Sequence, residues 1–185
     1  MKTIKFLSIL ALSGALFTSC SDDDDNTPEE VNEEEVITTM TVALVPQGGG
    51  DTITLQSRDI DGDGPGAPVV TVSGSLAGNT TYVGGIVLLN ETETPAEDIT
   101  EEVAEEDDEH QFFFQTTGSI AAVNYGDTDG DGNPLGIIFS LDTDTAGAAS
   151  ITITLRHEPK KPNDGTLADA GGETDITQTF DLTIQ

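Results

Sequence analysis

Hydrophobic and polar residues alternate along short stretches of the chain from residue 36 onward, and this alternation predicts β-strands. In residues 176–184, apolar side chains such as Phe180, Leu182 and Ile184 fall on one face, while threonine and aspartate fall on the other. Glycine, proline and aspartate separate the stretches, so we expect one all-β domain, an antiparallel Ig-like β-sandwich over residues 36–185. The expected strands are residues 36–45, 52–58, 69–73, 82–90, 111–116, 120–125, 136–141, 151–156 and 176–184.

A six-residue pattern of aspartate and glycine occurs twice, at residues 59–64 and again at residues 127–132. Strands and turns follow it in the same order, and Asp98-Ile99-Thr100 has a partner in Asp175-Ile176-Thr177. These matches predict an internal repeat, residues 36–100 and 110–185, of about four strands each. In the acidic stretch between the two halves, residues 101–106 are expected to form a short helix or to remain a loop.

The first 35 residues have a different pattern. Lys2 and Lys5 precede an apolar stretch, residues 6–17, that is too short to span a bilayer as a helix. Residues 1–19 are therefore expected to be a signal peptide that ends before Cys20, the only cysteine of the chain. Residues 20–35 are polar and acidic, which predicts a disordered tether.

Acidic residues outnumber basic ones 35 to six. Removal of the signal would leave four basic residues and a net charge of −31. Such a charge repels nucleic acid and attracts cations, so we expect no nucleic-acid partner. Solubility alone also explains much of this acidity.

The repeated pattern places carboxylates at alternate positions of a tight loop, where oxygen ligands suit Ca²⁺. The bidentate glutamate of an EF-hand is missing, because Val70 and Ile138 stand at that position, so a further ligand such as Asp142 or Asp144 would have to come from another loop. Plain tight turns are the other interpretation, since Asp-Gly pairs favour them. The candidate calcium ligands are Asp59, Asp61, Asp63, Asp127, Asp129 and Asp131.

Two histidines form a second candidate site. His110 precedes one expected strand and His157 follows another, and each would end a row of core-facing residues. If these strands are antiparallel neighbours, both imidazoles lie at one end of the sandwich, with Glu109 and Glu158 beside them. Imidazole and carboxylate together suit Zn²⁺ or a similar ion. Alternatively, both histidines are hydrogen-bonded or ion-paired residues at the edge of the core.

No nucleophile motif supports an enzyme. The chain lacks a Gly-x-Ser-x-Gly pattern and any tryptophan that could form a sugar platform, and Cys20 is assigned to the signal. We therefore expect no enzymatic activity. Lys160 and Lys161 lie between prolines and are expected to form a solvated turn.

The segment Phe17-Thr18-Ser19-Cys20 resembles a bacterial lipobox, and Ser21 with the four aspartates after it resembles the export signal of Bacteroidota surface lipoproteins. With residues 58–66 and 156–162, this segment resembles a group of small flavobacterial surface lipoproteins, often labelled "type 1 periplasmic binding fold superfamily". The label implies an α/β fold, which the strand pattern does not support.

The resemblance implies lipidation at Cys20 and an anchor in the outer membrane that faces the cell exterior. Some members of the group are similar to partners of TonB-dependent importers. We therefore expect a calcium-stabilised, non-enzymatic binding module that captures a ligand or metal for such an importer. The alternative is a structural or adhesive surface lipoprotein without a transported ligand.

Overall fold

The computed structural model describes residues 35–61 and 66–185, which form ten strands and two short helices. The helices are α1 (Ile99–Glu105) and α2 (Leu167–Ala170). The strands are β1 (Thr39–Pro46), β2 (Ile53–Arg58), β3 (Val69–Val72), β4 (Thr81–Asn90), β5 (Glu97–Asp98), β6 (His110–Gly118), β7 (Ile120–Tyr125), β8 (Ile138–Thr143), β9 (Gly147–His157) and β10 (Glu173–Ile184).

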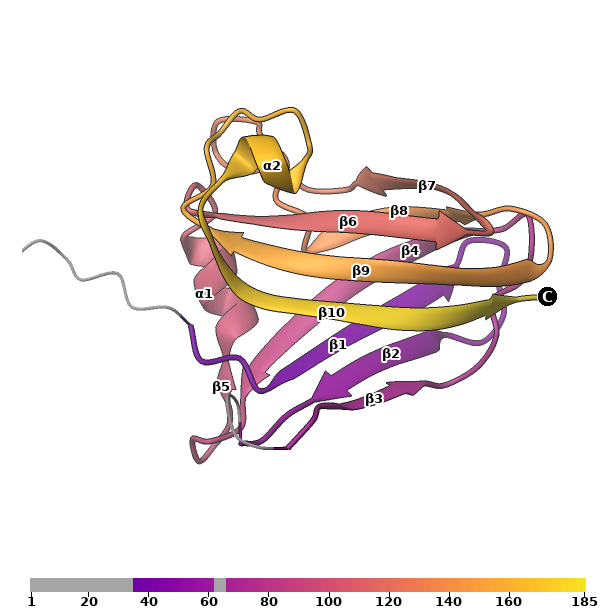
Figure 1. Cartoon of the computed structure of the whole chain (residues 1–185), viewed down its shortest axis with the longest axis horizontal. Helices are drawn as coiled ribbons and strands as arrows, with labels where there is room; N and C mark the ends of the chain where they lie inside the picture. The colour runs from indigo at the N-terminus through magenta and orange to yellow at the C-terminus, as the bar shows by residue number, and fades with distance from the viewer. Residues whose placement is uncertain (1–34, 62–65) are drawn as a thin grey trace, which may run out of the picture. The chain divides into compact units, whose positions relative to one another are not determined.

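The strands form two sheets that face each other (Figure 1). Sheet A has the order β3-β2-β1-β4-β8-β7, with β5 paired to β4, and sheet B has the order β10-β9-β6. All pairings between these strands are antiparallel. The predicted all-β sandwich is therefore confirmed, and the α/β fold implied by the name of the resembled group is not the fold of this chain.

The core lies between the two sheets, because alternate residues of each strand point inward. On β1 these are Met40, Val42 and Leu44, and from sheet B they include Ile153 and Phe180, all fully buried. Helix α1 adds Ile99 and Val103 to the same core. None of the helices in the described part of the chain is long and apolar enough to cross a membrane.

Helix α1 resolves the choice between helix and loop in the acidic stretch. Asp98 caps it, since its side chain accepts a hydrogen bond from the backbone N–H of Thr100 at 3.0 Å. Glu101 and Glu102 lie in the first turn, where negative charges stabilise the helix by interacting with the positive end of its dipole. The helix ends at Glu105, and a short turn leads from it to the start of β6 at His110.

The two expected halves share part of their strand pairing. The pair β2–β3 corresponds to β7–β8, and β1–β4 corresponds to β6–β9. The similarity does not extend to the first pair, because β1 and β2 are neighbours whereas β6 and β7 lie in different sheets. The chain crosses between the sheets at Gly118, whose φ of 71° is in the left-handed region that glycine adopts readily.

Candidate metal centre

His110 and His157 face each other at one end of sheet B. His110 is the first residue of β6 and His157 the last of β9, and the two are partners in the antiparallel register. Their rings make an edge-to-face contact with centroids 4.8 Å apart. The predicted placement of both imidazoles at the same end of the sandwich is therefore confirmed. In Figure 1 this is the end of sheet B beside α1.

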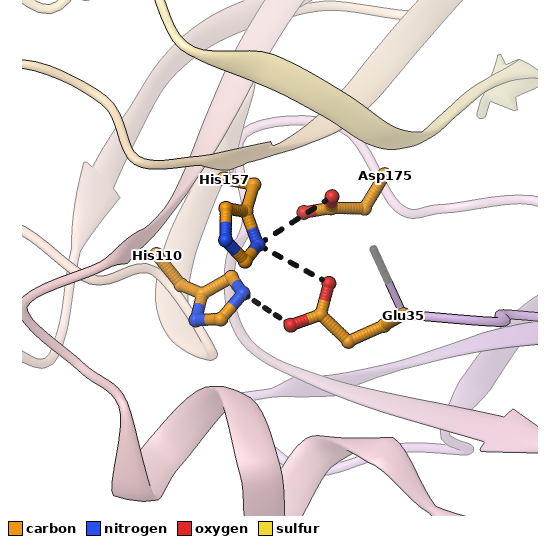
Figure 2. Close-up of side chains that lie close together, drawn as sticks. All are labelled: Glu35, His110, His157 and Asp175. Atoms are coloured by element: carbon orange, nitrogen blue, oxygen red, sulfur yellow. Dashed lines mark hydrogen bonds and ion pairs between the residues drawn. The ribbon is translucent and has the colours of Figure 1, made fainter. Parts of the chain in front are cut away.

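The carboxylate of Glu35 lies beside both histidines and contacts each of them, as Figure 2 shows. Its Oε1 atom is 2.6 Å from Nε2 of His110, and its Oε2 atom is 3.4 Å from Nδ1 of His157. The side chain is only 6% exposed. The segment after it is held by Thr38, which donates its backbone N–H to Leu89 O at 2.9 Å. Glu35, which the sequence pattern assigned to the tether, thus packs against the folded domain.

Asp175 completes the cluster because of a β-bulge. The register between β9 and β10 shifts between Thr174 and Ile176, so Asp175 is an extra residue on its strand. Simple alternation would place Asp175 with Thr177 on the outer face, whereas a bulge redirects the side chain. Its carboxylate is fully buried, and Oδ1 lies 3.8 Å from Nδ1 of His157 (Figure 2).

Helix α1 orients the ring of His110. The Nδ1 atom lies 3.1 Å from the backbone oxygen of Glu106, the residue at the C-terminal cap of the helix. A carbonyl oxygen can only accept, so Nδ1–H is the donor, and Nε2 is directed toward Glu35. Metal-binding histidines commonly have this arrangement, with one nitrogen donating to a backbone carbonyl and the other available as a ligand.

Burial and charge act in opposite directions on the pKa values of this site. Burial alone would raise the pKa of Glu35, but the contact with His110 and its charge outweigh it and lower that pKa. Burial alone would lower the pKa of His110, but the contact with Glu35, the bond to Glu106 and the charge of Asp175 together raise it. The buried carboxylates thus favour a positive charge among them.

Glu109 and Glu158, the acidic residues predicted beside the histidines, belong to a second group, which shares His157 with the group around Glu35. Ligand atoms of Glu109, His157 and Glu158 lie within 4.8 Å of one another, and those of Glu35, His110, His157 and Asp175 do so as well. The backbone N–H of Glu158 donates to Glu109 O at 2.7 Å. Since Glu158 is exposed, the second group offers less shielding than the group around Glu35.

A cavity of about 470 Å³ opens next to Glu35 and Asp175, which form part of its wall. It lies between the end of β2 in sheet A and the start of β10 in sheet B. Ser57 and Gln178 join the two sheets in this wall, with Ser57 Oγ donating to Gln178 Oε1 at 2.8 Å. Asp59 lines the cavity too, so this wall contains three carboxylates.

In the second Asp/Gly loop, backbone N–H groups and a lysine surround the carboxylates. Asp127 accepts from the N–H of Gly136 at 2.6 Å and of Ile138 at 2.8 Å. Asp129 accepts from the N–H of Asp131 at 3.0 Å. These bonds favour the interpretation as a tight turn. Calcium binding stays a prediction, and in the described residues these aspartates belong to neither group of clustered ligands.

The first Asp/Gly loop is described only in part, since Asp63 lies outside the described residues, as does Cys20. Asp59 and Asp61 lie close together, and the hydrogen bond between them lowers the pKa of Asp61. Asp61 also accepts from the backbone N–H of Gly66 at 3.2 Å. The structure therefore brings two of the three predicted ligands of this loop together.

The lysine beside Asp129 is Lys161, and its expected place in a solvated turn is wrong. Its side chain is 7% exposed, and Nζ lies 3.2 Å from Asp129 Oδ2. It also donates to the backbone oxygen of Asp107 at 2.5 Å. Lys160 is 61% exposed and pairs with Asp169 at the surface. The two neighbouring lysines thus differ mainly in the burial of their ion pairs.

We expect Lys161→Met to lower the free energy of unfolding by about 2 kcal/mol, because Asp129 would lose its buried charged partner and keep only neutral donors. The matched variant Lys160→Met removes an exposed ion pair and should cost less than about 1 kcal/mol. Urea denaturation of both variants checks this. Equal losses would contradict the distinction between the two ion pairs.

No protein-family model matches this chain, and comparison with curated proteins and with solved structures gives no significant match. The function must therefore be inferred from the residues themselves. Sequence patterns identified the two histidines. The two buried carboxylates, Glu35 and Asp175, emerge only from the fold, although the repeated Asp-Ile-Thr tripeptide marked the position of Asp175.

Proposed function

We propose that this protein is a non-enzymatic surface module that binds a divalent transition-metal ion. The observation that carries the proposal is the convergence of two imidazoles and two buried carboxylates, whose ligand atoms lie within 4.8 Å of one another. Histidine and carboxylate form the donor set of Zn²⁺ and related ions. The donors are Glu35, His110, His157 and Asp175 (Figure 2).

The contact between His110 and Glu35 supports an ion at this place. Their atoms are 2.6 Å apart, yet Nε2 of His110 does not have the alignment of a hydrogen bond to Glu35. With Nδ1–H donating to Glu106, the lone pair of Nε2 faces the carboxylate of Glu35, and a cation bound between them would relieve the repulsion. Imidazole ligands also favour a transition metal over Ca²⁺, which prefers oxygen.

The proposed setting follows the sequence patterns at the N-terminus. Lipidation at Cys20 would anchor the domain to the outer membrane, and a net charge near −31 would concentrate cations around it. We propose that such a module supplies its ion to a TonB-dependent importer. Stabilisation by calcium at the Asp/Gly loops is a separate part of the proposal and does not depend on the histidines.

Zinc affinity of two matched variants tests the metal centre. Glu35→Gln keeps the size of the side chain but removes its charge, and it should weaken Zn²⁺ binding about 100-fold or more, since even outer-shell changes cost 10- to 100-fold. Glu158→Gln makes the same chemical change at the exposed group and should leave the affinity within about threefold, because Glu158 lies outside the proposed ligand set. Isothermal titration of the purified full chain with Zn²⁺ measures both.

The outcomes separate the alternatives. A larger loss in Glu158→Gln than in Glu35→Gln would place the ion at the second group, with Glu109 and His157. No binding of Zn²⁺, Ni²⁺ or Co²⁺ by the unchanged protein would refute the proposed function. The ion-paired histidines would then support the alternative, a structural or adhesive surface lipoprotein.

A further inference from the structure

The proposed ligands approach the ion from two sides. Glu35 and Asp175 belong to the cavity wall, whereas His110 does not line the cavity. The side chain of Asp175 is fully buried and that of Glu35 is 6% exposed, so Glu35 is the carboxylate that reaches the cavity. The imidazole of His110, 2.6 Å from Glu35, lies behind it as seen from the cavity. An ion among these groups would have protein on its inner side and the cavity on its outer side.

Transition-metal ions accept more than four ligands when space allows. Zinc expands from four to five ligands during catalysis, and several related ions prefer six. In the outer direction from this centre, the cavity of about 470 Å³ provides that space. Its volume falls within the range of cavities that hold small organic ligands.

We propose that the ion bound at this centre accepts a nitrogen-donor ligand, an imidazole or an uncharged amine, from the cavity. This proposal rests on the proposed function, because it requires the ion, and it adds a third component to the complex. The cavity would thus be a second binding site, in which the bound ion contacts the ligand.

Charge selects a nitrogen donor over an anionic oxygen donor. Glu35 and Asp175 together balance the two charges of the ion, so the loaded centre has no positive charge left to attract an anion. Asp59 adds a negative charge to the cavity wall, and none of the described residues that line the cavity is a lysine or arginine. The field of the whole chain, with 35 acidic residues, acts in the same direction.

The lining also suits a ring better than a simple ion. Ile37, Pro68 and Ile176 contribute apolar surface, while Ser57 and Gln178 contribute polar groups that already bond each other. Most ligand sites combine such apolar walls with a few polar groups. The imidazole could belong to a free small molecule or to a histidine side chain of a partner protein.

Visible absorption of the Co²⁺-loaded full chain tests the proposal, because the bands of Co²⁺ report a change of ligands. Imidazole should shift the bands in a saturable way, while acetate at the same concentration should not. Pro68→Trp fills the cavity from an exposed position outside the metal ligands and should weaken the imidazole effect at least tenfold without changing the bands of the loaded protein. A blocked tripeptide with a central histidine distinguishes the sources, since tighter binding than free imidazole indicates a protein partner.

Failure of this inference differs from failure of the proposed function. If Co²⁺ binds but imidazole leaves its bands unchanged, the ternary complex is refuted and the metal centre stands. An equal response to acetate and imidazole, or loss of Co²⁺ from the protein on gel filtration with imidazole, also refutes it. If Co²⁺ does not bind at all, the proposed function itself fails.

Discussion

Replacing Gly118 with alanine is expected to lower the free energy of unfolding by about 3 kcal/mol, the upper range for strain and overpacking. A Cβ atom at this position would lie 2.1 Å from the backbone oxygen of Ala148 and 2.9 Å from Cα of Ala149. The φ of 71° is also strained for any residue with a Cβ. Because the neighbouring atoms belong to the backbone of β9, they cannot move aside without breaking its pairing.

Gly85 provides the matched control for Gly118. It lies in β4, and a Cβ atom there would meet nothing within 4 Å. Gly85→Ala should therefore leave the stability unchanged or raise it by up to about 1 kcal/mol, because alanine reduces the entropy of the unfolded chain. Urea denaturation monitored by circular dichroism compares the two variants. If Gly118→Ala proves as stable as Gly85→Ala, the close approach of β6 to β9 at this crossing is not as described.

Zinc at about a thousand times its Kd is expected to stabilise the protein by about 4 kcal/mol, because the ion binds the folded state alone. For a domain of this size, that gain corresponds to a rise in melting temperature of roughly 8–16 °C. The reason is the cluster itself: its donors come from separate segments, with Glu35 before β1 and Asp175 in β10. Only the folded chain brings them together. Melting of the full chain in EDTA and in Zn²⁺ measures the difference.

Glu35→Gln is the control for this gain: with an affinity about 100-fold weaker, it should gain at most about 1.4 kcal/mol at the same zinc concentration, while it melts as a folded protein in EDTA. Calcium gives an independent comparison. A rise of the melting temperature in millimolar Ca²⁺ that persists in Glu35→Gln would support the Asp/Gly loops as calcium sites. An unchanged melt in calcium would contradict that prediction, and an unchanged melt in zinc would contradict the metal centre.

Alternation was sufficient to locate the histidines. His110 shares its face with Phe112, and His157 follows the row that contains Ile153 and Leu155, so each marks the end of a buried row. Strand neighbours could not be read from alternation, because the period of two applies within a strand and not between strands. The register of β6 and β9 supplied that information.

The two carboxylates escaped the same reasoning for different physical reasons. Glu35 ends a long acidic run, and no local pattern distinguishes it from the residues before it. Asp175 lies just before the expected strand of residues 176–184, and the bulge that redirects its side chain cannot be seen in the alternation. Its counterpart in the repeated tripeptide, Asp98, instead caps α1, so the same three residues serve two structures.

The Asp/Gly loops show the limit of local motifs. The spacing of Asp127 and Asp129 fits both a calcium loop and a tight turn. The two interpretations differ in what the carboxylates contact, a calcium ion or donor groups of the protein. For Asp129 these donor groups include Lys161, which is distant in the sequence and lies in a loop that looked solvated. Long-range contacts of this kind depend on the complete fold.

The crossing at Gly118 explains how one strand pattern produces two layers. The second half of the domain keeps two of the three strand pairings of the first half, β6 with β9 and β7 with β8. It lacks the pairing that would correspond to β1 with β2. Because β6 and β7 are not paired, β7 and β8 extend sheet A beside β4, while β6, β9 and β10 form sheet B. The missing pairing between β6 and β7 thus distributes the second half over two facing sheets, and the two histidines lie at the end of β6 opposite this crossing.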